Sequence, residues 1–157
     1  MKYYEEFYDF MQKYTDFYID ISENEKEKMN ALSSDDLAKI NKILSEYQIY
    51  VKKTELYEKR RKELFGKIGI EGKTFKEIVD METGENHEEL EDLFYSFRDA
   101  VMSAKEYNMR SLEIARNNIK AMGMLDYDGI SDPACYDKNG MISENQFSDI
   151  GLLNRKA

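Results

Sequence analysis

Side chains suited to catalysis are scarce in this chain. Among 157 residues there is one histidine, His87, and one cysteine, Cys135. A nucleophilic or acid–base site needs a second group within hydrogen-bond reach of the first, and neither residue has such a partner at a recognisable spacing. No two carboxylates share an apolar face in the way that acid–base catalysis by a carboxyl pair requires. The chain is therefore predicted to be a binding protein and not an enzyme.

Metal and phosphate sites are not predicted either. His87 has no second histidine to complete a metal site and is expected to be an exposed residue in the first turn of a helix. Gly66, Gly69 and Gly72 lack the spacing of a Walker or dinucleotide loop and follow a helix, where those motifs follow a strand. The polar residues near the C-terminus fail the EF-hand pattern of glycine at position six and glutamate at position twelve. They are Asp126, Asp128, Asp132, Asp137 and Asn139. No cofactor is expected.

The composition favours an all-helical cytoplasmic protein. The chain has a single proline, and its net charge of −9 repels nucleic acid and anionic membranes. The one dense basic run, residues 59–62, has glutamates three and four residues away, so we expect ion pairs along a helix face. A lone cysteine gives no sign of an oxidising compartment, and no segment reaches the run of about 18 apolar residues that a membrane span needs.

The first two helices are expected over residues 2–31 and 34–65. Aromatic side chains crowd the first half of the first helix at three- and four-residue spacing, and we interpret them as the wide end of a helical core. A peptide groove lined with aromatic anchors is the alternative. The segment Ser22–Lys28 is almost wholly polar and is expected to be solvated. Ser33 or Ser34 is expected to be the N-cap of the second helix, after a short turn between antiparallel helices.

The second helix is followed by glycines and then by a helix-start signal. Gly66, Gly69 and Gly72 are expected to stop the helix and to permit positive backbone angles. Thr74 and Glu77 match a capping box, which predicts a short helix directly after them. The fold class is therefore all-α. We expect an elongated antiparallel three-helix bundle or coiled-coil-like hairpin, with a short extra helix between the second and third long helices.

The last long helix is expected over residues 87–122 and carries two apolar stripes. One is a seam that begins at Leu90, and the second gathers near the C-terminal end. The second stripe is formed by Leu112, Ile114, Ile119 and Met122. Such a stripe is either covered by the rest of the chain or offered to a partner helix. Residues 1–122 are expected to form the helical domain, and residues 123–157 a tail that is partly ordered or folds on binding.

Taken in order, three motifs resemble the FlgN family of flagellar export chaperones. They are Ala31–Leu37 at the helical turn, Arg60 and Arg61 with Leu64 before Gly66, and Gly72–Ile78 with its capping box. Residues 108–112, Asn-Met-Arg-Ser-Leu, are similar to the family's third-helix pattern. The resemblance extends over about residues 29–122. None of these motifs is catalytic, so the resemblance depends on their order and spacing together.

The resemblance implies a cytosolic chaperone that binds the C-terminal helical segment of hook-associated (hook-filament junction) proteins and delivers them to the flagellar type III export gate. In the family the C-terminal region engages the client, and Tyr136 is a candidate contact for either the client or the gate. Carried over to this sequence, the partner-binding residues are Ile114, Ile119, Met122, Met124, Leu125, Tyr127 and Tyr136.

Two other functions remain open from the residues alone. The first is a non-enzymatic helical adaptor or coiled-coil dimerisation subunit, unrelated to flagella, whose seams pair two copies of the chain. A homodimer is compatible with the chaperone interpretation as well. The second is an enzyme, which has the least support because so few side chains are suited to acid–base, nucleophilic or metal chemistry.

Overall fold

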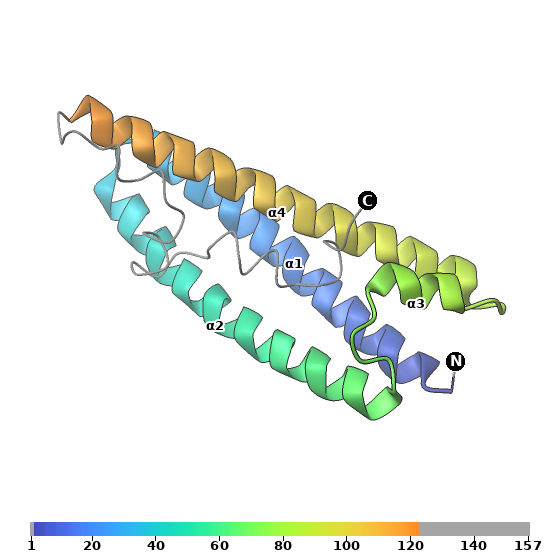
Figure 1. Cartoon of the computed structure of the whole chain (residues 1–157). Helices are drawn as coiled ribbons and strands as arrows, with labels where there is room; N and C mark the ends of the chain where they lie inside the picture. The colour runs from blue at the N-terminus through green and yellow to red at the C-terminus, as the bar shows by residue number, and fades with distance from the viewer. Residues whose placement is uncertain (1, 123–157) are drawn as a thin grey trace.

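The computed structural model describes residues 2–122, and this part of the chain consists of four helices without a strand. They are α1 (Tyr4–Ser33), α2 (Leu37–Ile68), α3 (Phe75–Met81) and α4 (His87–Ala121). Three long helices lie lengthwise beside one another, and the short α3 lies across one end (Figure 1). The predicted all-α class is confirmed for the described residues.

The helices α1 and α4 form the main packing unit. They run in the same direction, and α2, which lies between them in the sequence, runs in the opposite direction (Figure 1). Three hydrogen bonds join residues of α1 and α4 that are 85, 80 and 86 positions apart, which fixes a nearly constant register. By comparison the backbone of α2 approaches that of α1 at fewer points than α4 does, and it comes close to α4 at few or none. The pair α1–α4 therefore carries most of the core.

The core is aromatic at the end where α3 lies. Its buried side chains come from all four helices: Phe7, Met11, Tyr14, Tyr18, Leu64, Phe65, Phe75, Leu90, Phe94 and Phe97. We call this set the aromatic end. Phe75 places α3 in it, because its ring lies 5.6 Å from that of Phe7 and 5.4 Å from that of Phe94. Edge-to-face rings at these distances stabilise a core beyond their buried area. The prediction that the N-terminal aromatics form core is confirmed.

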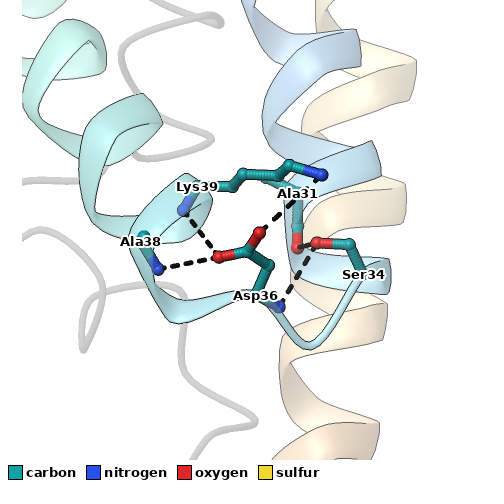
Figure 2. A network of polar contacts seen from close by, with 5 residues as sticks. All are labelled: Ala31, Ser34, Asp36, Ala38 and Lys39. Atoms are coloured by element: carbon teal, nitrogen blue, oxygen red, sulfur yellow. Dashed lines mark hydrogen bonds and ion pairs between the residues drawn. The ribbon is translucent and has the colours of Figure 1, made fainter.

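The turn between α1 and α2 differs from the prediction. Neither Ser33 nor Ser34 caps α2; the N-cap is Asp36, whose Oδ1 accepts hydrogen bonds from the backbone N–H groups of Ala38 at 3.0 Å and Lys39 at 3.2 Å (Figure 2). The reason is that α1 continues to Ser33, and the Ser34 hydroxyl donates back to a carbonyl of α1. Asp35 then reverses the chain with a positive φ of 56°, an angle that aspartate tolerates better than most residues.

The segment between α2 and α3 largely follows the prediction. Gly69 ends α2 in the left-handed conformation, with a φ of 75°, and Gly72 also has a positive φ. Gly66 does not stop the helix, however, and lies within the last turn of α2. Thr74 and Glu77 form the predicted capping box, with hydrogen bonds in both directions. This cap orients α3 so that Phe75 enters the core.

Candidate functional site

The predicted partner-binding residues that the structure describes lie at the C-terminal end of α4. Asn118 Nδ2 donates to the carbonyl of Leu32 at 3.2 Å, so the last turn of α4 begins where α1 ends. Ile119 and Met122 follow this contact, three residues apart on one side of the helix. Met122 is 72% exposed and Ile119 is half-buried. This end of α4 is an apolar projection beyond the turn that joins α1 and α2.

The other predicted site residues are not all part of this projection. Ile114 is half-buried, but it precedes Ile119 by five residues, which places it about 140° away around the helix. Met122 lies between the two around the helix axis, about 80° from Ile114 and about 60° from Ile119. The structure therefore brings Ile119 and Met122 together at the helix end and leaves Ile114 about two turns before Met122. Met124, Leu125, Tyr127 and Tyr136 lie outside the described residues, as does Cys135.

A second exposed apolar surface lies on the face of α4 that points away from α1. Tyr95, Met102 and Met109 are 43%, 59% and 50% exposed and recur every seven residues. We call these three residues the outer stripe. Its seven-residue spacing is visible in the sequence, but this surface was not predicted, because the seam that begins at Leu90 is the stronger apolar pattern in this helix. Both methionines are flexible side chains that can fit partners of different shape.

The segment Ser22–Lys28, which we call the polar half of α1, was predicted to be solvated, and the structure confirms this only in part. Glu23, Lys26 and Glu27 are exposed, but the other four residues of the segment are buried. Glu25 and Lys28 are both 0% exposed, and their side chains form an ion pair at 2.6 Å. Lys28 Nζ also donates to Asn108 Oδ1 of α4 at 3.0 Å and lies 4.0 Å from the ring centroid of Tyr47 in α2. Glu25, Lys28, Tyr47 and Asn108 therefore form one cluster that joins the three long helices. We call it the polar layer.

The polar residues of this segment were predicted to be solvated because polar sequence normally indicates surface. What the sequence does not show is that the partner helices place matching groups opposite them. Asn108 lies on the seam that begins at Leu90, at the same three- and four-residue spacing, and it meets Lys28 across that seam. A buried charge is tolerated only when it is paired and hydrogen-bonded, and both conditions hold for Lys28.

Burial opposes the charged forms of this pair. It raises the pKa of the Glu25 carboxyl, with Lys28 and the Tyr47 hydroxyl acting in the other direction. It likewise lowers the pKa of the Lys28 ammonium, which Glu25 partly offsets. Two perturbed groups in contact are a common feature of catalytic sites, but structural ion pairs show it too. Because both groups are wholly buried within the three-helix contact, we interpret the pair as structural.

The remaining candidate residues, His87 and the basic run of residues 59–62, contribute contacts within the fold. His87 is the first residue of α4, as predicted, but it is half-buried and its Nδ1 lies 2.6 Å from the carbonyl oxygen of Glu82. The basic run on α2 pairs with neighbouring glutamates as expected, with Arg61 bound to Glu58 at 2.9 Å. Within residues 2–122, no group of three or more potential ligands is placed to hold a metal ion.

Neither the family models, the curated proteins nor the solved structures include a match to this chain. In the described part of the chain, no helix combines the length and apolar character needed to cross a bilayer.

Proposed function

We propose that this chain is a non-enzymatic helical protein that binds a partner protein at the projecting end of α4. The observation that carries the proposal is the exposure of Met122, with Ile119 beside it, on a helix end that extends past the turn between α1 and α2. An amphipathic partner helix can dock on such a projection through residues spaced three and four apart. The flexible methionine side chain suits a surface that meets more than one partner.

The narrower form of this proposal is a cytoplasmic export chaperone of the FlgN type. Its support is the resemblance of residues 29–122, together with an all-helical scaffold in which Asn118 joins the end of α4 to the end of α1. In this interpretation the scaffold is an elongated three-helix bundle, and α3 closes its aromatic end. The client is the C-terminal helical segment of a hook-associated protein, covered until it reaches the export gate. Covering an amphipathic segment prevents its premature self-assembly.

A binding experiment with a matched control tests this proposal. The Ile119→Asp/Met122→Asp variant is expected to lose affinity for purified C-terminal segments of hook-associated proteins by at least about tenfold, because a charge in an apolar contact is costly. The control is Ile49→Asp/Leu56→Asp, which changes two exposed apolar residues of α2. It should bind like the wild type. Circular dichroism must show unchanged helical content in both variants.

Three outcomes of this experiment are informative. Loss of binding only in the α4 variant supports both the client and the site. Equal binding by all three proteins would contradict the site assignment. No binding of any flagellar segment by the wild type would contradict the flagellar client, and affinity capture from host cytosol would then be needed to find the partner.

An adaptor or dimerisation subunit is the second candidate function, and a specific observation favours it. Apolar side chains are exposed at seven-residue spacing along α4, at Tyr95, Met102 and Met109. Seven-residue spacing is typical of helices that pair along their length. A chain that associates with itself and ignores flagellar segments would have this second function.

A further inference from the structure

The outer stripe is apolar along its centre and carries opposite charges on its two sides. Four residues after each stripe residue there is an acidic side chain, in turn Asp99, Glu106 and Glu113, and all three are exposed. Three residues after Tyr95 and Met102 there is a basic one, Arg98 and Lys105. Positions three and four residues on lie on opposite sides of a helical stripe. The stripe therefore has an acidic edge and a basic edge.

Some charged side chains on the two edges have no ion-pair partner among the described residues. Arg98 lies over the Tyr95 ring at 4.8 Å and binds Asp99 at 2.8 Å, and Arg110 pairs with Glu106. Lys105 and Glu113 make no ion pair within the described residues, which leaves one charge available on each edge. A partner that covers the stripe should therefore place an acidic side chain opposite Lys105 and a basic side chain opposite the acidic edge.

We propose that the outer stripe binds a second copy of this chain, with the two α4 helices side by side and running in the same direction. In such a pair, related by a two-fold axis along the helices, opposite edges meet. The basic edge of each copy then faces the acidic edge of the other. Lys105 of one copy lies beside Glu106 of its partner, an exposed carboxylate that it would share with Arg110. This proposal rests on the second candidate function, self-association, and gives it a contact and an orientation. It is independent of the proposed client site, because Ile119 and Met122 are not part of the contact.

The opposite orientation is disfavoured by the same charges. When two identical helices pair in antiparallel fashion, the same edge of each meets its counterpart, as e meets e and g meets g in coiled coils. Asp99 and Glu106 would then face acidic residues, and Lys105 would face Arg98. Like charges across a contact are destabilising and suppress that arrangement. The self-complementary pattern therefore selects the parallel pair.

The contact is small, so the expected dimer is weak. From Tyr95 to Met109 the stripe extends about 21 Å at 1.5 Å per residue. Contacts of this size belong to the weak and transient class, and we expect a dissociation constant on the order of 100 µM. The net charge of −9 on each copy adds long-range repulsion, so moderate salt should not abolish association that the apolar stripe drives.

Sedimentation equilibrium of the full chain tests the proposal. The wild type should show concentration-dependent dimers, and Met102→Glu/Met109→Glu should be monomeric. Ile49→Glu/Leu56→Glu on α2 is the matched control and should still dimerise. Lys105→Glu alone and Glu106→Lys alone should each weaken the dimer about tenfold, because each places like charges at two symmetric contacts. An equimolar mixture of these two variants should restore association.

Cross-linking distinguishes the two orientations. In a Cys135→Ser background, Tyr95→Cys should form a disulfide dimer with itself, because equivalent residues meet in the parallel pair. The antiparallel arrangement would instead link Tyr95→Cys to Met109→Cys in a mixture and would overturn the proposed orientation. A wild type that stays monomeric well above the expected dissociation constant would overturn the proposal, as would a dimer unaffected by the Met102 and Met109 changes.

Discussion

The two ends of the α1–α4 contact hold the same pair of helices together with opposite chemistry. At the aromatic end, Phe7 and Tyr14 of α1 and Phe97 of α4 are buried among other rings. About two turns beyond Tyr18, the contact is made by a buried ion pair, Glu25–Lys28, with Asn108 opposite. The two regions have different roles in the helix contact. Apolar burial supplies stability, and directional polar contacts determine which residues of α1 and α4 meet.

The energetic difference follows from desolvation. Burying a large aromatic side chain is favourable by about 1.5–3 kcal/mol, and paired rings add to this. A buried ion pair loses its hydration, and replacing such a pair with apolar residues of similar volume is often neutral or stabilising. What the ion pair adds is selectivity, because sliding α1 along α4 by one turn would separate Lys28 from Asn108. The polar layer therefore specifies register more than it stabilises the fold.

The helix α2 packs more extensively against the aromatic end than against the polar layer. Its buried residues near its C-terminus, Leu64 and Phe65, belong to the aromatic end, whereas Tyr47 covers Lys28. Between them Thr54 is the one buried residue of α2, while Tyr50 and Tyr57 pack partly buried against the Phe17 ring. Local opening costs least where few apolar contacts are buried. The first half of α2 should therefore separate from α1 more readily than its last two turns.

The largest expected effect is the loss of an aromatic ring from the aromatic end. Phe97→Ala should destabilise the fold by about 3–5 kcal/mol, because it removes ring contacts with Tyr14, Tyr18 and Phe75 and leaves a cavity. Urea unfolding followed by circular dichroism measures this change. Met102→Ala on the exposed outer stripe is the control and should change stability by less than about 0.5 kcal/mol. A small effect of Phe97→Ala would contradict the assignment of stability to this end.

Within the polar layer, single and double changes should differ. Lys28→Met leaves the Glu25 carboxylate buried without its cation and should cost about 3 kcal/mol. Glu25→Leu/Lys28→Met removes both charges and should be close to wild type in stability. Urea unfolding of the wild type, Lys28→Met, Glu25→Leu and the double variant gives the coupling between the two positions. If the double variant is the least stable of the set, the ion pair contributes stability as well as register.

The aromatic end could be predicted from the sequence, and the polar layer could not. Phe7, Met11, Tyr14 and Tyr18 follow a three- and four-residue spacing that indicates a buried face whatever packs on it. Glu25 and Lys28 have the same spacing, but polar side chains are buried only when a partner meets them, and the partner Asn108 is 80 residues away. The single sequence carries no information on that pairing.

The candidate binding surfaces show the same limit. Ile119 and Met122 belong to an apolar stripe near a helix end, and the resemblance assigns them to partner binding. Their exposure depends on where α1 ends, which was predicted to within two residues. The α2 cap was misplaced by two residues, because three adjacent candidates, Ser34, Asp35 and Asp36, all favour caps and turns. Only the backbone course, with its positive φ at Asp35, distinguishes them.

Alkaline pH should affect the two regions in opposite directions. Burial raises the pKa of Tyr18 above its ordinary value of 10, so the stability it contributes is complete below pH 10 and is lost as pH rises further. The pKa of Lys28 is lowered, so its contribution is complete above its ordinary value of 10.5 and is lost as pH falls through the folded value. Each ionisation changes stability by up to about 1.4 kcal/mol per pH unit.

Urea midpoints between pH 8 and pH 11 separate these contributions. Tyr18→Phe should lose less stability above pH 10 than the wild type does. Glu25→Leu/Lys28→Met should lose more as pH rises toward 10.5, because it lacks the gain from Lys28. Parallel pH curves for the wild type and both variants would mean that neither group titrates differently in the folded and unfolded chain.

The smallest expected effect is at the turn between α1 and α2. It tests whether the first turns of α2 are stabilised by their own N-cap or by the packing of the whole helix. Asp36→Ala removes the acceptor of two backbone N–H groups and should cost about 1 kcal/mol. Ser34→Ala, which removes only the hydrogen bond to Ala31, should cost less. Hydrogen exchange should show the loss confined to the first turns of α2, because Leu64 and Phe65 anchor the far end. Uniformly faster exchange along α2 would instead mean that the helix opens as one unit. In that case the contacts of Leu64 and Phe65 would not keep the last turns of α2 closed when its first turns open.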